Sequence, residues 1–274
     1  MKKIHSSNLR FQFGKNWMKY IKNINQNKID LAKYSMKKMY DIDFRSDENF
    51  LDIGCGSGLF SLCAKEFGLS VHSFDFDNDS VECTRMIKDK FHPNDKNWNI
   101  EQGSILDKSY ISGLDKYNYV YSWGVLHHTG DMYLAMDNAA SLVKKNGLLY
   151  IALYNYQPFL SSIWTKIKRI YNRSNFLFKS IIIFFSVLYL WLPKLLFDMI
   201  KLKPFNSWIN YSQTSLRGMS PWTDLLDWVG GYPFEVASPD VIINFYIKKG
   251  FQLKKIKTVG GKLGCNEYLF INKQ

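Results

Sequence analysis

The stretch Leu51-Asp-Ile-Gly-Cys-Gly-Ser-Gly-Leu-Phe60 decides the fold of this chain. A mostly apolar segment, residues 50–53, leads into a turn with glycine at three alternate positions, Gly54, Gly56 and Gly58. A segment with an apolar helical face follows, so the order predicts a buried strand, a tight turn and a helix. Glycines at such a turn let the chain reverse sharply and let a ligand lie against the main chain. The stretch therefore predicts a ligand site at the start of the helix.

Two acidic residues sharpen this prediction. Asp52 lies at the end of the first strand, and Asp75 closes a second apolar strand, residues 71–75. Asp75 follows the glycine turn by about 20 residues, the spacing expected of a carboxylate that binds ribose hydroxyls. The glycines differ from the Gly-x-Gly-x-x-Gly spacing of dinucleotide sites, which argues against a nicotinamide-dependent dehydrogenase.

Length and composition fit one large α/β domain with insertions. The chain has 274 residues, of which 46% are hydrophobic, so a full core is available. The net charge of +12 would suit nucleic acid, an anionic membrane or an acidic substrate. Because the lysines are scattered along the chain, we favour a solvated basic surface and expect no nucleic-acid partner.

The cysteines and the amino terminus indicate a cytoplasmic protein. The four cysteines form no Cys-x-x-Cys pair and no cluster with the five histidines, so we expect reduced thiols and no metal site. Residues 1–6 lack the apolar core of a signal peptide.

The chain divides by pattern into four parts. Residues 1–45 predict an N-terminal helical cap, in which residues 13–17 are a candidate cover for the ligand site. Residues 46–156 alternate strands and helices, as a parallel sheet requires. Residues 157–235 form an insertion. Residues 236–274 predict a helix over 239–249, opened by Ser238, and two final strands over 251–259 and 267–272.

The insertion begins with an aromatic and basic part. Residues 180–192 carry no charge and precede Pro193, which predicts that the helix stops there. A bilayer span needs about 20 residues, so the run is too short to cross a membrane. Residues 180–203 therefore form a lid, a homodimer contact or, given the flanking lysines, a peripheral contact at the inner membrane face.

The second part of the insertion, residues 217–235, is rich in glycine, proline and tryptophan and cannot be one helix throughout. Long loops inside compact domains are usually functional. We therefore predict a wall of the substrate pocket that includes Arg217, Trp222 and Tyr232, with a rigid packing loop as the alternative.

The glycine turn after Leu51-Asp52 resembles motif I of class I S-adenosylmethionine (SAM)-dependent methyltransferases. Further segments resemble the later motifs of that family in order: residues 71–75, 102–107, 119–128 and 147–154. The resemblance is greatest to the ubiquinone-biosynthesis O-methyltransferases. It implies an α/β fold: a Rossmann-like, seven-stranded class I methyltransferase sheet with an N-terminal helical cap, the insertion between the fifth and sixth strands, and a final antiparallel hairpin.

The resemblance also implies SAM as the cofactor and assigns its contacts. Gly54, Gly56 and Gly58 would admit its methionine part and ribose, Asp52 would orient its amino group, and Asp75 would bind the ribose. The adenine would meet Ser104 and Ile105, and Trp123 would complete the cofactor side. Asp107 either joins the adenine contact or caps the next helical turn. Asp77 and Asp79 are predicted to cap a helix or to be exposed acids.

The acceptor side begins with a histidine pair. His127 and His128 follow the fourth strand, whose carboxyl end lies where open α/β sheets bind ligands. Histidine suits general-base catalysis near neutral pH, and we favour His128 for this role, with packing as the alternative. Tyr154 and Asn155 end the fifth strand and are candidate hydrogen-bonding partners of the acceptor.

Residues 122–125 exclude two relatives of the family. Their Ser-Trp-Gly-Val sequence lacks the Pro-Pro-Tyr-like tetrad of nucleic-acid amino-methylating enzymes and the aspartate of metal-dependent catechol methylation. We expect O-methylation of a small hydroxylated aromatic or lipid-linked acceptor. The alternatives are a sugar or surface-polysaccharide unit and a non-catalytic SAM-binding protein.

Overall fold

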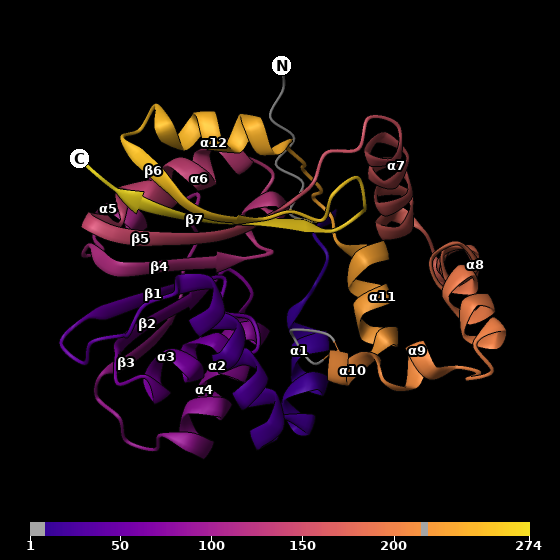
Figure 1. Ribbon diagram of the computed structural model, residues 1–274, viewed down its shortest axis with the longest axis horizontal. Helices are drawn as coiled ribbons and strands as arrows, with labels where there is room; N and C mark the ends of the chain where they lie inside the picture. The colour runs from indigo at the N-terminus through magenta and orange to yellow at the C-terminus, as the bar shows by residue number, and fades with distance from the viewer. Residues whose placement is uncertain (1–8, 215–218) are drawn as a thin grey trace. The chain divides into compact units, whose positions relative to one another are not determined.

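The computed structural model describes residues 9–214 and 219–274, which belong to two units (Figure 1). The larger unit joins Phe13–Gln157 to Glu235–Gln274, and the smaller joins Pro158–Phe234 to the N-terminal residues up to Gln12. The insertion therefore clusters with N-terminal residues rather than with the sheet, and the larger unit is completed by a segment that follows the insertion.

The larger unit is built on a seven-stranded sheet in the order β3-β2-β1-β4-β5-β7-β6. β7 runs antiparallel to both β5 and β6, and the other described neighbours run parallel. This confirms the predicted sheet and its closing hairpin. The strands are β1 (Asn49–Ile53), β2 (Ser70–Asp75), β3 (Trp98–Gln102), β4 (Tyr117–Trp123), β5 (Val143–Tyr154), β6 (Phe251–Lys257) and β7 (Cys265–Asn272).

The central strands β1 and β4 are largely buried on both faces, which explains why most of their side chains are apolar or aromatic. The helices of this unit are α1 (Gly14–Tyr20), η2 (Ile21–Asn23), α2 (Gln26–Tyr40), α3 (Leu59–Glu66), α4 (Asn78–Phe91), α5 (Lys108–Ser112), η3 (Leu126–His128), α6 (Met132–Ser141) and α12 (Pro239–Ile247). The side chains of Asn25, Asp77, Asp107 and Asp131 accept hydrogen bonds from the first-turn N–H groups of α2, α4, α5 and α6. Asp77 thus has the predicted capping role.

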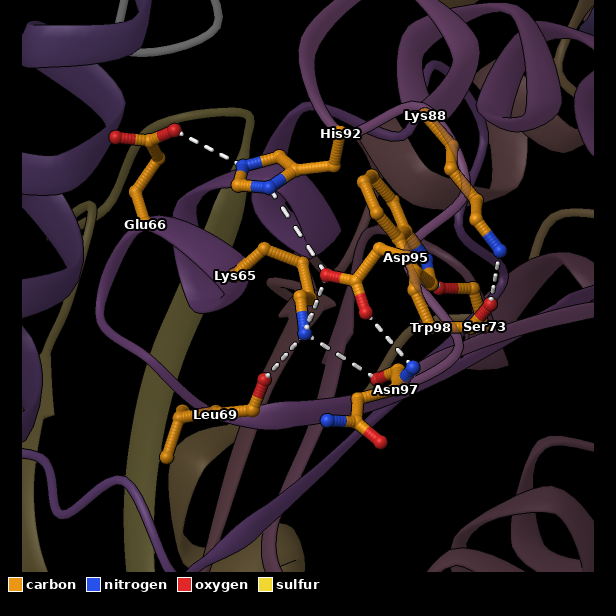
Figure 2. A network of polar contacts seen from close by, with 9 residues as sticks. All are labelled: Lys65, Glu66, Leu69, Ser73, Lys88, His92, Asp95, Asn97 and Trp98. Atoms are coloured by element: carbon orange, nitrogen blue, oxygen red, sulfur yellow. Dashed lines mark hydrogen bonds and ion pairs between the residues drawn. The ribbon is translucent and has the colours of Figure 1, made fainter.

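A network of paired polar groups lies where β2 and β3 begin (Figure 2). Lys65 Nζ lies 2.9 Å from the Asp95 carboxylate and donates to the main-chain oxygen of Leu69 at 3.1 Å. His92 Nε2 lies 3.0 Å from the Glu66 carboxylate. Burial alone would raise the pKa of Asp95, but the hydrogen bonds from Lys65 and from a main-chain N–H outweigh it, and the pKa is lowered. These charges hold the ends of two helices and two strands together.

The smaller unit is helical and corrects one prediction. It contains α7 (Leu160–Arg173), α8 (Phe176–Ile200), α9 (Asn206–Ile209), α10 (Tyr211–Thr214) and α11 (Pro221–Gly230). The prediction that the apolar helix stops at Pro193 is wrong, because α8 continues through that proline for seven residues. A proline removes one helical hydrogen bond, and the good helix formers that follow it, Lys194 to Leu196, keep the helix intact.

Within residues 219–235, the described portion of the second part of the insertion, only α11 is helical, as the glycine and proline content predicted. Ser220 caps α11 by accepting a hydrogen bond from the Thr223 N–H, and Pro221 occupies the first turn. Buried Lys168 of α7 ties this helix to α7: its ammonium donates to the main-chain oxygen of Trp228 and lies 4.5 Å from the centre of the Trp228 ring.

Candidate functional site

The glycine turn connects β1 to α3 and adopts a conformation that only glycine enters freely. Gly54, Gly56 and Gly58 have φ angles of 75°, 54° and 76°. A Cβ on Gly54 would lie 2.5 Å from the Val125 methyl groups, and one on Gly56 would lie 3.0 Å from the Trp17 indole nitrogen. Because Gly54 and Gly56 have no Cβ, the side chains of Val125 and Trp17 can approach the main chain of the turn closely.

Asp75 ends β2 beside this turn. Its carboxylate accepts a hydrogen bond from the Gly56 N–H at 3.1 Å and another from the Asp77 N–H at 2.9 Å. Two main-chain donors therefore fix an anionic side chain at the carboxyl edge of the sheet. Carboxylates so held are suited to accept hydrogen bonds from the two hydroxyls of a ribose.

Asp52 lies deeper in the same unit. Its side chain is buried, and its carboxylate accepts a hydrogen bond from Ser61 Oγ at 2.5 Å. Ser61 Oγ lies 2.8 Å from Ser73 Oγ, which accepts the Trp98 indole N–H. The pKa of Asp52 is raised to about 7 by burial, the largest cause; the Ser61 hydrogen bond opposes this rise, and the negative charge of Asp75 adds to it.

The predicted adenine side lies after β3. Ser104 Oγ accepts a hydrogen bond from the Leu106 N–H, and Ile105 is buried with its main-chain oxygen bonded to Asn138. Asp107 caps α5, accepting from the N–H groups of the first turn. Of its two predicted roles, the structure therefore supports the cap.

Trp123, at the carboxyl end of β4, hydrogen-bonds to the Tyr150 hydroxyl. Tyr150 in turn donates to Glu267, which lies 2.8 Å from Lys257 Nζ. The indole therefore belongs to a polar chain that crosses β5 and β7, and its contact with the cofactor stays a prediction.

The histidine pair lies on η3 directly after β4, and both rings are buried. The Tyr154 main-chain N–H donates to His127 Nδ1 at 3.3 Å, so the proton of neutral His127 resides on Nε2. The Tyr154 ring lies 3.9 Å from the His127 ring, centre to centre. His128 packs between Phe13, at 4.9 Å, and Tyr154, at 5.4 Å. The His127 ring thus accepts a main-chain hydrogen bond, and the His128 ring packs among aromatic rings.

A third acid holds the histidine loop in place, and the sequence did not reveal this role. Glu235 accepts hydrogen bonds from the N–H groups of Gly130 and Met132, at 3.1 and 3.2 Å. Its own N–H donates to the main-chain oxygen of His127 at 3.0 Å. Burial raises the pKa of Glu235, although the two N–H donors lower it. The only sequence signal was an acid at the end of the insertion, more than 100 residues from the loop that it fixes.

The predicted cover segment lies over the glycine turn. The Gly14 N–H donates to Asp77 at 3.0 Å, which seats the start of α1 on the loop after β2. From there Trp17 lies against Gly56, and Phe13 lies against His128. One short helix thus closes over both the glycine turn and the histidine pair.

The acceptor residues predicted on β5 have different outcomes. The Tyr154 ring contacts both histidines, as described above. The Asn155 side chain instead accepts from Asn266 at 3.0 Å and donates to the Lys262 main-chain oxygen at 3.3 Å. Since both ends of its amide are engaged, one by β7 and one by the β6–β7 loop, the structure does not support an acceptor contact for Asn155.

The remaining predicted substrate residues belong to the smaller unit. Arg217 lies outside the described residues. Trp222 is about half exposed in the first turn of α11, and the Tyr232 main-chain oxygen accepts a hydrogen bond from the Phe11 N–H. Their contact with an acceptor stays a prediction.

The residues present fit SAM. The fixed Asp75 carboxylate, held by the Gly56 and Asp77 N–H groups beside the positive-φ glycine turn, offers acceptors for a ribose.

Known proteins agree with this geometry. A sequence profile described as a methyltransferase domain matches residues 24–179, more than half of the chain. The ubiquinone biosynthesis O-methyltransferase of Pelagibacter ubique is 27% identical over 143 residues, 50% of this chain and 56% of that protein. The enzyme of the same name from Brucella melitensis biotype 2 is 27% identical over 106 residues, 39% of this chain and 41% of that one. The chain thus spans about half the length of the curated relatives it matches.

Solved structures share the fold. A SAM-dependent methyltransferase from Anabaena variabilis has a TM-score of 0.56 at 12% identity, covering 95% of this chain and 93% of that one. Magnesium protoporphyrin IX methyltransferase from Synechocystis, with bound SAH, has a TM-score of 0.54 at 12% identity and covers 94% of each chain. The chain belongs to the methyltransferase domain family and has the fold of class I SAM-dependent methyltransferases.

Proposed function

We propose that the enzyme transfers the methyl group of SAM to a hydroxyl of a small hydroxylated aromatic or lipid-linked acceptor. SAM supplies an electrophilic methyl group, and the protein must position the acceptor oxygen and remove its proton. The relatives named ubiquinone biosynthesis O-methyltransferases support oxygen as the acceptor atom. No comparison names the acceptor of this chain, so its class is part of the proposal.

The observation that carries the proposal is the position of the histidine pair, directly after the central strand β4. His127 accepts a main-chain N–H through Nδ1 and serves to orient the loop. His128 lies next to it, enclosed by the rings of Phe13 and Tyr154, at the carboxyl end of the central strand β4. We assign His128 as the general base, since an imidazole titrates close to neutral pH.

On the cofactor side we assign Gly54, Gly56 and Gly58 to the methionine part and ribose, and Asp75 to the ribose hydroxyls. Asp52 supplies negative charge toward the amino group of SAM. Ser104, Ile105 and Trp123 complete the cofactor contacts. We assign Tyr154 to the acceptor, and Trp222 and Tyr232 of the smaller unit remain candidate substrate residues in this proposal. The enzyme acts in the cytoplasm.

The test compares two histidine variants. Purified protein is incubated with SAM and a metabolite extract from cells that lack the gene, and mass spectrometry identifies species that gain one methylene unit. We expect His128→Ala to lower turnover by about 10²–10⁴-fold, the usual contribution of a general base, with SAM affinity unchanged by calorimetry. The control is His92→Ala, which removes a histidine from the network where β2 and β3 begin.

The outcomes separate the alternatives. Loss of SAM binding in His128→Ala would count against the general-base role. Methylation of soluble sugars, without any methylated aromatic or lipid species, would replace the proposed acceptor by a sugar or polysaccharide unit.

A further inference from the structure

Helix α8 has an inverted distribution of polar and apolar residues. Its buried residues are Ser186, Trp191 and Asp198. Large apolar side chains on the rest of its surface are exposed, among them Phe178, Phe184, Phe185, Leu188, Leu196 and Phe197. A helix of a protein surrounded by water shows the opposite arrangement, with apolar residues inside. α8 is therefore not built to face water.

Specific contacts within the smaller unit fix this orientation. The Asp198 carboxylate accepts hydrogen bonds from the Ser207 N–H at 2.6 Å and the Ser207 hydroxyl at 2.7 Å. The Trp191 ring packs against Trp208 at 4.5 Å and against Tyr211 at 5.2 Å. Rotating α8 to bury its phenylalanines would break all of these contacts, so the apolar face stays outward.

The charge around α8 is almost all positive. Residues 160–203 contain eight lysines and arginines and a single acid, Asp198. That acid is buried and hydrogen-bonded, while Lys194, Lys201 and Lys203 are exposed. An apolar helix face bordered by exposed lysines fits the interface of an anionic bilayer, in which acyl chains lie beneath negatively charged headgroups.

The sheet topology excludes a membrane crossing by α8 alone. α8 has 25 residues, about 37 Å in length, and is the one described helix long and apolar enough to cross a membrane. The chain enters the insertion from β5 and returns from it to α12 and the hairpin. Because β5 pairs with β7, both ends of the insertion lie on one side of any bilayer. A single crossing would separate them.

We propose that α8 docks the enzyme on an anionic phospholipid bilayer, lying along its surface with the phenylalanine face at the level of the acyl chains and its lysines among the phosphates. A second copy of this chain would also cover the apolar face, but it would bring two strongly cationic surfaces together. The charge therefore favours lipid over self-association. The proposal does not depend on the identity of the methyl acceptor.

The test is flotation of the full-length protein with vesicles of phosphatidylcholine alone or in equimolar mixture with phosphatidylglycerol. We expect binding to the anionic vesicles and little to the neutral ones. The charge variant Lys194→Gln/Lys201→Gln/Lys203→Gln should weaken binding on the order of 10–100-fold, since each lysine near an anionic surface contributes about fivefold. Its control changes three exposed lysines of the larger unit, Lys96→Gln/Lys145→Gln/Lys254→Gln, and should bind normally.

The apolar variant Phe184→Ser/Phe185→Ser/Leu188→Ser should weaken binding at least tenfold. Its control, Met86→Ser/Ile256→Ser, alters exposed apolar residues of the larger unit and should bind like the native protein. Absence of binding to anionic vesicles would overturn the proposal, as would equal binding by the charge variant. A lipid-free dimer in sedimentation velocity that the apolar variant converts to monomer would show that a second copy covers α8.

Discussion

The two edges of the sheet use the same kinds of residue for different purposes. Where β2 and β3 begin, Asp95 is paired with Lys65, and its pKa is lowered (Figure 2). At the carboxyl edge, Asp52 is buried with Ser61 as its hydrogen-bond donor, and its pKa is raised to about 7. A carboxylate paired with a cation stabilises the fold, whereas a buried acid that no lysine or arginine side chain joins in a salt bridge is costly in its charged form. This difference distinguishes the scaffold from the site.

The largest expected effect is a loss of SAM affinity on mutation at the carboxyl edge of the sheet, with no loss at the opposite edge. Asp75→Ala removes the carboxylate assigned to the ribose and should weaken SAM binding about 100-fold, since one hydrogen bond to a charged group contributes roughly 1.5–3 kcal/mol. Asp95→Ala at the opposite edge should leave the affinity unchanged. Isothermal titration calorimetry measures both, and equal affinities of Asp75→Ala and the native protein would remove Asp75 from the cofactor site.

A smaller effect should appear in stability at the other edge. Lys65→Met leaves His92 Nδ1, at 3.9 Å from the Asp95 carboxylate, as the neighbouring basic side chain among the described residues, and removes donors to two main-chain oxygens. We expect the free energy of unfolding to fall by about 2 kcal/mol, with SAM affinity retained at low temperature. Urea titration measures this change, and Lys96→Met, at an exposed site, is the control. A stability loss no larger than that of the control would show that the network does not stabilise the fold.

The smallest effect is a difference in pH dependence. The folded pKa of Asp52, about 7, lies above its unfolded value of about 3.9, so the stability linked to this group is full below about pH 4 and is lost as the pH rises toward 7. The lowered pKa of Asp95 has the opposite sign: its stability is present above the unfolded pKa and is lost as the pH falls through the folded one.

Unfolding measured from pH 3 to pH 8 should therefore show two limbs. Between pH 6 and 7, Asp52→Asn should remove about 1 kcal/mol of the pH-dependent decrease in the free energy of unfolding. Asp95→Asn should reduce the decrease that occurs at acid pH. If Asp52→Asn changed the pH dependence of unfolding only at acid pH, the assignment of a raised pKa to Asp52 would be wrong.

Much of the fold was predictable because its signals are local. The glycine turn, the apolar strands and the helix opened by Ser238 and Pro239 each depend on neighbouring residues, and the structure confirms them. The prediction that the helix ends at Pro193 was wrong because it relied on local information alone. The helix-breaking tendency of this proline was outweighed in a helix of 25 residues. The different surroundings of His127 and His128 were beyond local reasoning, because Phe13, Tyr154 and Glu235 approach them from distant parts of the chain.

The sequence by itself determined the class of fold and the edge of the sheet that holds the site, since these follow from the order and spacing of short motifs. The resemblance of those motifs to class I methyltransferases implied the cofactor. The tertiary structure decided what individual side chains do. It buried Asp52 and paired Asp95, engaged His127 through the main chain, seated the histidine loop on Glu235 and turned the phenylalanines of α8 outward. Burial and partners set the pKa and exposure of a side chain, and both come from residues that only folding brings together.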